Sequence, residues 1–269
     1  MKMLDCVISG ITKLRSRRLS TYLFVSVIMT LFAACSTPTV SSDDAGEDDY
    51  SSSIDKLKES FFNPDIDYGS MTDSRDGRVY RTVKIGEQTW MAENLNYAIA
   101  NGSFCYGNVS SNCAKYGRLY TWAAAIDSVK LYDDGDGVDC GYGKTCKMPE
   151  KVQGSCPGGW HLPSNTEWTT LFTTVGGKSM AGKMLKSQSG WYKDGNGSDS
   201  VGFAAQPAGR IIYNTGAFNR LGSLADFWTA SGGDSEKFAY AVFLDYDWDR
   251  AAQNNVNKVY GHSVRCVKD

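Results

Sequence analysis

Histidine is scarce in this sequence of 269 residues, which contains only His161 and His262. Mechanisms that need several histidines, as metal ligands or as catalytic bases, are therefore excluded. An excess of positive charge is also absent, because 28 Lys and Arg stand against 30 Asp and Glu and no basic stripe occurs after residue 34. A nucleic-acid partner is therefore not expected. No Cys-x-x-Cys spacing occurs either, so a zinc site is not expected.

Residues 1–34 have the pattern of an export signal. A basic leader precedes the mostly apolar run 19–34, whose 16 residues are fewer than the about 20 that a membrane-spanning helix needs. The ending Leu31-Phe32-Ala33-Ala34-Cys35 resembles a bacterial lipobox. This predicts a signal peptide over 1–34 and a lipid-modified Cys35 that attaches the protein to a membrane. A plain secretory signal or an uncleaved anchor is the alternative.

Residues 35–72 are predicted to form a flexible tether. The stretch 36–53 is rich in Ser, Thr and acidic residues and has almost nothing that would enter a core. Its acidity resembles the surface-export signals of some Gram-negative lipoproteins, although a solvated tether needs the same composition. We expect one globular domain over 73–269.

The domain mixes strand and helix patterns. Alternating side chains predict a hairpin over 78–94. Ser164 and Glu167 form a capping box, which predicts a helix start, and Gly176-Gly177 predicts its end. Further helices are expected at 119–129 and 179–187, and strands at 210–213, 227–231, 238–246 and 262–268. The predicted class is therefore α+β, with short helices and antiparallel strands.

Six cysteines remain once Cys6 in the leader and Cys35 are set aside, and an even number in an exported chain predicts three disulfides. Six cysteines allow 15 pairings. Proximity in the sequence pairs Cys105 with Cys113 and Cys140 with Cys146, which leaves Cys156 for Cys266. No thiol is then left over to act as a nucleophile.

The acidic segment 133–139 resembles part of a calcium loop, because Asp134, Asp136 and Asp139 offer alternating carboxylates. The usual loop adds a Glu about six residues further on, and none occurs there. A solvated acidic turn explains the same composition. Calcium is the one cofactor that the sequence suggests, and otherwise none is expected.

Tryptophans divide into two groups by context. Five lie in segments with apolar periodicity and are predicted to be core: Trp90, Trp122, Trp160, Trp168 and Trp228. Two others lie in polar turns, where aromatic rings next to charged groups suit stacking on a sugar and hydrogen bonding to its hydroxyls. The predicted ligand-binding residues are Trp191, Tyr192, Asp245, Tyr246, Asp247, Trp248 and Arg250. Packing is the alternative for Trp191, and a cation site or simple solvation for the aspartates.

Several segments together resemble one family, the Fibrobacter succinogenes major paralogous domain, found in exported and often lipid-anchored bacterial surface proteins. The segments are Val79–Gly86, Gln88–Tyr97, Tyr116–Tyr120, Cys156–Pro163, Glu167–Trp168, Gly202–Phe203, Phe227–Thr229 and Ser263–Val267. The resemblance implies a disulfide-bonded α+β fold similar to the C-type lectins, with two short helices and curled antiparallel strands. In that fold a disulfide commonly joins the first helix region to the last strand. It implies no settled reaction or ligand.

Two departures limit what the resemblance implies. Gln206-Pro207-Ala208-Gly209 stands where relatives usually have Leu-Pro-Gly-Gly, and the Glu-Pro-Asn and Trp-Asn-Asp motifs of calcium-dependent lectins are absent. Calcium-bridged sugar recognition is therefore not carried over.

Catalysis is not expected from this sequence. No Ser-His-Asp arrangement is recognisable, and His161 is interpreted as a turn residue. Sulfatase-activating oxidases also use a C-type-lectin-like fold, but their chemistry needs redox-active or metal-binding thiols, and none is spare here. We expect a non-catalytic surface lipoprotein whose domain binds an extracellular polysaccharide or a partner protein. A structural component of the envelope is the alternative.

Overall fold

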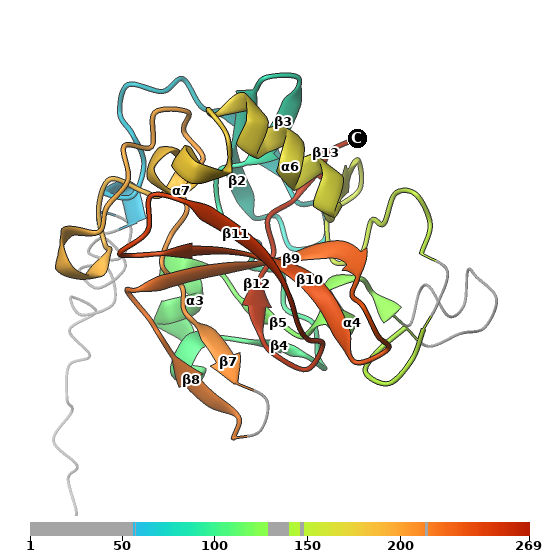
Figure 1. The fold of residues 1–269 in the computed structure, drawn as a ribbon. Coiled ribbons are helices and arrows are strands. Elements are labelled where there is room, and N and C mark those ends of the chain that lie inside the picture. The colour runs from blue at the N-terminus through green and yellow to red at the C-terminus, as the bar shows by residue number, and fades with distance from the viewer. Residues whose placement is uncertain (1–55, 57, 129–139, 146–147, 213–214) are drawn as a thin grey trace, which may run out of the picture. The chain divides into compact units, whose positions relative to one another are not determined.

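Two β-sheets and a two-stranded ribbon form the framework of the domain in the computed structural model, which describes residues 56, 58–128, 140–145, 148–212 and 215–269 (Figure 1). All of these residues lie in one unit, Ala45–Asp269. The domain is therefore α+β, as predicted. No helix in this part of the chain has the length and apolar character needed to cross a bilayer.

The first sheet has the strand order β1-β2-β3-β13-β6. Its strands are β1 (Gly69–Thr72), β2 (Val79–Ile85), β3 (Gln88–Met91), β13 (Val267–Lys268) and β6 (Trp160–His161). β2 and β3 form the predicted hairpin, with Val83 opposite Trp90. The C-terminal β13 pairs with both β3 and β6, so it closes the sheet between segments far apart in the sequence.

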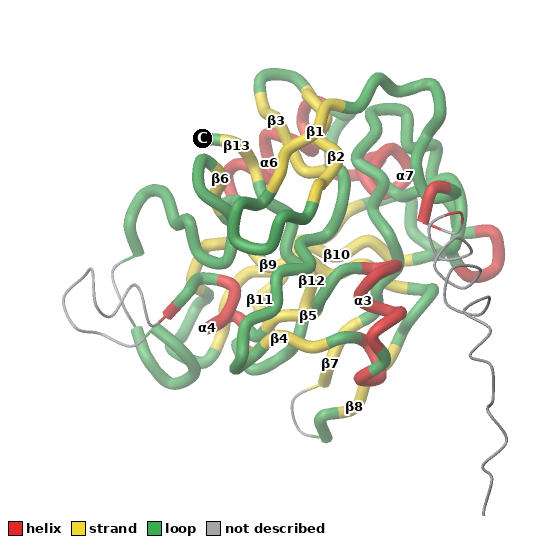
Figure 2. Tube along the Cα trace, turned by 180° about the vertical axis from the view of Figure 1, so that it is seen from behind, coloured by secondary structure: helices red, strands yellow, loops and turns green. Residues whose placement is uncertain are grey.

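The second sheet has the order β11-β10-β9-β12-β5-β4. Its strands are β11 (Ala251–Asn257), β10 (Phe238–Asp245), β9 (Leu224–Gly232), β12 (His262–Ser263), β5 (Leu119–Tyr120) and β4 (Ser103–Phe104). β12 runs parallel to β9, and the other pairs are antiparallel. The ribbon consists of β7 (Arg210–Ile212) and β8 (Ala217–Asn219). Figure 2 shows helix α3 (Ser110–Tyr116) beside this ribbon.

Helix α6 (Asn165–Thr174) begins at the predicted capping box. Ser164 Oγ accepts a hydrogen bond from the Glu167 N–H at 3.2 Å, and Glu167 Oε2 accepts one from the Ser164 N–H at 2.8 Å. The helix buries Trp168, whose ring lies 4.9 Å from that of Trp90 between centroids. Helix α7 (Lys178–Leu185) follows where the second helix was predicted, and it packs against α6 and β11. The five tryptophans predicted to be core are all buried.

Two predicted elements are replaced by shorter ones. Instead of a helix over 119–129, β5 is followed at once by the single turn α4 (Trp122–Ala125), because the Thr121 side chain accepts the Ala124 N–H and starts the helix there. The predicted strand 262–268 is broken into β12 and β13, which belong to different sheets. Strand β11 was not predicted, because its sequence Ala-Ala-Gln-Asn-Asn-Val-Asn is largely polar.

The packed domain begins earlier than Asp73. Phe61 and Phe62 are buried, and the Phe61 ring lies 5.8 Å from that of Tyr116. β1 pairs along its whole length with β2. The predicted tether 35–72 therefore needs a correction for residues 58–72, where a pair of apolar side chains and a short strand join the fold.

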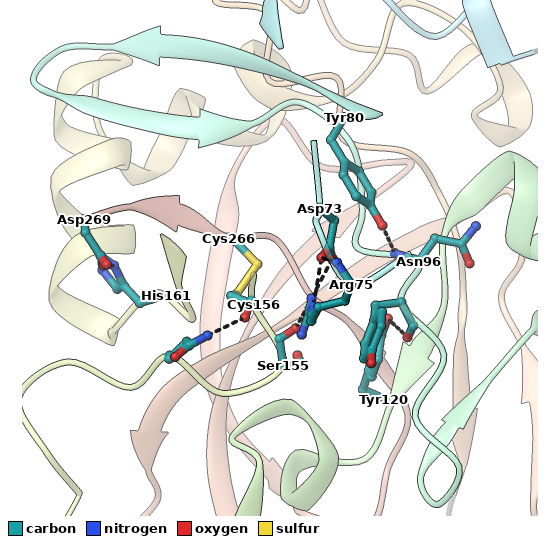
Figure 3. Close-up of a disulfide and its surroundings, with 12 residues drawn as sticks. Asp73, Arg75, Tyr80, Asn96, Tyr120, Ser155, Cys156, His161, Cys266 and Asp269 are labelled. Carbon is teal, nitrogen blue, oxygen red and sulfur yellow. Dashed lines mark hydrogen bonds and ion pairs between the residues drawn. A yellow bond between two sulfur atoms is a disulfide. The ribbon is translucent and has the colours of Figure 1, made fainter. Parts of the chain in front are cut away.

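Two of the predicted disulfides are present, Cys105–Cys113 and Cys156–Cys266. Cys140 is also disulfide-bonded, while Cys146 lies outside the described residues. The Cys156–Cys266 bond joins the segment before β6 to the segment before β13 (Figure 3). Beside it, Arg75 binds the buried Asp73 carboxylate through two nitrogens, at 2.9 and 2.7 Å, and donates to the Ser155 carbonyl at 3.0 Å.

Loss of the long-range disulfide is expected to destabilise the domain most. The Cys156–Cys266 pair spans 110 residues and Cys105–Cys113 spans 8. Chain entropy therefore predicts a loss in free energy of unfolding of up to about 4.7 kcal/mol for Cys156→Ala/Cys266→Ala, against about 2.5 kcal/mol for Cys105→Ala/Cys113→Ala. Equilibrium denaturation of the two double variants measures both values. Equal losses would show that loop length does not set the contribution of these bonds.

A histidine between two carboxylates ties α6 to the C-terminus. His161 Nε2 lies 2.7 Å from Glu167 Oε1, and Nδ1 lies 2.7 Å from Asp269 Oδ1. Burial alone would lower the pKa of His161, but its hydrogen bonds to Glu167 and Asp269 outweigh burial and raise that pKa. For Glu167 burial would raise the pKa, and the hydrogen bonds from His161 and Ser164 lower it instead.

These shifts predict a stability that depends on pH. A raised histidine pKa contributes stability that is full below the unfolded value of 6.5 and is lost as pH rises through the folded value. The free energy of unfolding of the parent minus that of His161→Gln should therefore shrink as pH rises above 6.5, because deprotonation removes the charge that both carboxylates contact. Denaturation curves from about pH 5 to about pH 9 measure the difference. A difference independent of pH would contradict a charged His161.

Candidate functional site

Two aromatic segments predicted to bind ligand lie side by side. They are the 3-10 turn η2 (Tyr192–Asp194) and the turn 246–250, which follows β10. The backbone N–H groups of Tyr192 and Tyr246 donate to the carbonyls of Gly222 and Ser223, at 2.7 and 3.0 Å. One loop therefore positions both tyrosines. Gly195 permits the close approach, since a Cβ there would lie 2.1 Å from the Tyr246 carbonyl oxygen.

The tyrosine pair presents an open aromatic surface. Tyr192 is 56% exposed, and its ring meets the half-buried Tyr246 edge-on with 5.4 Å between centroids. Lys193 Nζ lies 5.4 Å from the centre of the Tyr192 ring. The exposed Asp247 follows Tyr246 directly. Aromatic rings with hydrogen-bonding groups beside them are the usual means of binding a sugar face and its hydroxyls. We call these residues (Tyr192, Lys193, Tyr246, Asp247) the tyrosine face.

Trp248 and Arg250 form a second pair in the same turn. The Arg250 guanidinium carbon lies 3.9 Å from the centre of the Trp248 ring. Trp248 is half-buried and packs on the hydrophobic cluster around Trp228, whereas Arg250 is exposed. Arg250 therefore covers part of the Trp248 ring, and its guanidinium is the more exposed member of this pair.

Two predicted ligand residues do not lie on the surface. Trp191 is 5% exposed, and its Nε1 donates to Ser187 Oγ at 3.0 Å and to the Ala205 carbonyl at 3.2 Å. Its polar turn suggested exposure, but the indole packs in the core, which was the alternative for this residue. Asp245 is also buried, and Arg220 Nη2 donates to its carboxylate at 2.5 Å. Both residues therefore support the face from beneath.

The aspartates of this region do not share one face of a strand. β10 ends at Asp245, so Asp247 and Asp249 lie in the turn, both exposed. Burial and the nearby Asp247 carboxylate raise the pKa of Asp245, while the Arg220 guanidinium lowers it. The three carboxylates therefore have different surroundings, and only two of them face solvent.

A buried lysine holds the turn in place. Lys186 is 2% exposed, and its Nζ donates to the carbonyls of Asp245, Tyr246 and Trp248 at 3.0, 3.3 and 3.0 Å. Burial lowers the pKa of this ammonium, and the nearby aspartates oppose that effect. Three main-chain acceptors on one ammonium fix the path of the turn. The turn is therefore preorganised, and preorganisation of a surface lowers the entropic cost of binding.

A comparison with known protein families identifies the family of this chain. The model of the Fibrobacter succinogenes major domain matches residues 83–268. The chain belongs to this family. Neither curated proteins nor solved structures gave a match. The family match begins within β2, so Phe61, Phe62 and β1 are packed onto the Fibrobacter succinogenes major domain from outside the matched range.

A buried charged cluster in the family domain was not found from the sequence. Asp226 and His262 are both fully buried, with His262 Nδ1 3.3 Å from Asp226 Oδ2, and Arg210 Nη1 lies 3.5 Å from the same oxygen. The His262 ring packs edge-on against Trp228 at 4.4 Å between centroids. Residues so distant in the sequence give no local pattern that predicts this cluster. Asp226 and His262 are covered from solvent, whereas the Arg210 side chain is 25% exposed.

The calcium prediction falls outside what the structure describes. Asp134, Asp136 and Asp139 all lie in the segment 129–139. Among the described residues, no group of three or more His, Cys, Asp or Glu side chains is arranged to hold a metal ion. Calcium binding by the acidic segment therefore stays a prediction.

Proposed function

We propose that this family domain is a non-catalytic ligand-binding module of a lipid-anchored envelope protein, and that its tyrosine face binds an extracellular polysaccharide. One observation carries the proposal: Tyr192 is 56% exposed and is held edge-on against Tyr246, next to the exposed charges of Lys193 and Asp247. What supports the proposal is the combination of an exposed ring, a second ring packed against its edge and charged groups beside both.

The rigid support beneath the face also favours binding. The Lys186 ammonium fixes the 246–250 turn, and the Gly222 and Ser223 carbonyls fix the two tyrosine backbones. Such preorganisation is typical of surfaces that bind flexible polymers, since it lowers the entropic cost of association. The lipid anchor at Cys35 and placement at the outer membrane or cell surface are part of the proposal and rest on the lipobox-like sequence.

We also propose that the fold is C-type-lectin-like. Three features support this relation: the two short helices α6 and α7, the sheets of curled strands, and the disulfide from Cys156 to Cys266, which precedes the last strand. In this proposal the turn after β10 belongs to the later loops, which tend to form the binding face in that fold.

Removing the exposed ring is expected to weaken binding without loss of stability. Retention of the oxidised full-length protein, in detergent, is measured on cellulose, xylan, chitin and peptidoglycan. Tyr192→Ala should weaken retention at least about tenfold, which corresponds to about 1.4 kcal/mol. Its melting temperature should stay close to the parent value, since exposed substitutions change stability by only about 0.5 kcal/mol.

Phe238→Ala is the matched control, because Phe238 is an exposed aromatic residue (38%) at the opposite end of β10. It should bind like the parent. Equal retention of Tyr192→Ala and the parent would refute the tyrosine face as the site. No retention of the parent on any polymer would instead favour a structural role in the envelope.

A further inference from the structure

A small hollow lies on a part of the domain that the tyrosine face does not use. Its walls come from five segments: the stretch before β1, the start of β2, the residues after β3, α3 with the residue that follows it, and Gln206 in the stretch before β7. It is shallow and open to solvent. Pockets that enclose a whole drug-sized ligand usually measure about 300 to 1,000 Å³, so this hollow offers a surface contact for one chemical group and does not enclose a ligand.

Positive charge dominates the lining. Lys58, Arg78 and Lys115 line the hollow, against one carboxylate, that of Glu93. Glu93 is already neutralised, since it forms ion pairs with Lys58 and, at 3.8 Å, with Arg81, which also donates its backbone N–H to Glu93 Oε1 at 2.9 Å. The charges of Arg78 and Lys115 are thus left for a ligand.

The two remaining cations, Arg78 and Lys115, have no close carboxylate partner among the residues that the structure describes. Lys115 Nζ lies 4.9 Å from the centre of the Tyr116 ring and 5.4 Å from that of Phe61, and it has no ion pair among the described side chains. Arg78 has a single carboxylate partner there, Asp76, at 3.8 Å. Aromatic faces orient a cation but leave its full charge.

An amide with a free donor also lines the hollow. Gln206 is 1% exposed, and its Nε2 has no hydrogen-bond acceptor within the described part of the chain. A buried amide donor without a partner costs about 1 to 3 kcal/mol. An acceptor supplied by a ligand would remove that cost. Two cations and an amide donor together match the needs of an oxyanion, whose oxygens accept several charge-assisted hydrogen bonds.

We propose that this hollow binds a single oxyanion group, a carboxylate, sulfate or phosphate, through Arg78, Lys115 and Gln206. The group arrives either as a free ion or as the acidic substituent of a sugar. The site shares no residue with the tyrosine face. The two proposals therefore succeed or fail separately.

The test is a titration of the oxidised full-length protein, in detergent, with sodium glucuronate, sulfate and phosphate, with glucose as the neutral probe. Calorimetry at about 0.15 M salt limits screening effects to physiological ones. Saturable binding of at least one oxyanion, and none of glucose, is expected. Lys115→Gln and Arg78→Gln should each weaken that binding roughly tenfold, since each removes a charge-assisted hydrogen bond.

Lys84→Gln is the matched control, because Lys84 is an exposed lysine on β2 that does not line the hollow. It should leave the affinity unchanged. Gln206→Leu keeps the side-chain volume and removes the donor, so it should weaken binding without lowering the melting temperature. Tighter binding of glucuronate than of the inorganic ions would identify a sugar acid as the source, and equal binding would identify a free ion.

Two results would overturn the proposal. One is the absence of saturable binding by all three oxyanions. The other is equal weakening by Lys84→Gln and Lys115→Gln, which would reduce the effect to net charge. Tyr192→Ala should bind the oxyanion like the parent, so a failure at the hollow is distinguishable from a failure at the tyrosine face.

Discussion

Arg265 lies on the segment that runs from β12 in one sheet to β13 in the other, and its guanidinium is buried there. Arg265 is fully buried between β12 and β13. It donates to Asn94 Oδ1 through Nε and Nη2 at 3.1 and 2.9 Å, and to the carbonyls of Met91, Phe203 and Ala204. Burial lowers the pKa of Arg265 to about 9, so it is still charged at neutral pH. A buried charge is costly unless its hydrogen bonds are satisfied, and four separate acceptors must therefore stay in place around it.

This constraint explains local features that otherwise look unfavourable. Ala204 has a positive φ of 48°, an uncommon conformation for a residue with a side chain. Its carbonyl accepts from Arg265, and its N–H donates to the buried Asp199 carboxylate at 2.7 Å. Burial raises the pKa of Asp199 to about 7. The bend at Ala204 is thus held between a buried cation and a buried acid.

Main-chain carbonyls also satisfy the other buried cations. Lys186 fixes the turn beneath the tyrosine face, and Lys258 Nζ donates to the carbonyls of Cys140, Gly141 and Lys144 at 3.2, 3.3 and 2.8 Å while lying 4.5 Å from the Trp122 ring centre. Each ammonium fixes the path of a loop that has little secondary structure of its own. Loops fixed in this way are suited to presenting a binding surface.

The sequence predicted correctly those features that depend on neighbouring residues or on the number and spacing of cysteines. The Ser164/Glu167 capping box requires residues three apart. The Cys156–Cys266 pair was what remained of six cysteines after the other four had been paired by proximity in the sequence. Prediction failed where burial depends on distant partners. Arg265 was one position of a predicted strand over 262–268, and Trp191 was proposed as a ligand residue because of its polar turn. Of the candidate site, Tyr192 and Tyr246 were each proposed as ligand residues from their neighbours in the sequence, but their contact with each other and the support from Lys186 required the fold.

The most direct test of this account is the free energy of unfolding of Arg265→Met, with Arg250→Met as the same substitution at an exposed arginine. Arg265→Met leaves four acceptors without a donor, so we expect a loss of at least about 3 kcal/mol. Arg250→Met should lose no more than about 1 kcal/mol, the size of an exposed contact between a cation and a ring. An Arg265→Met variant as stable as the parent would contradict the claim that this buried charge organises the fold.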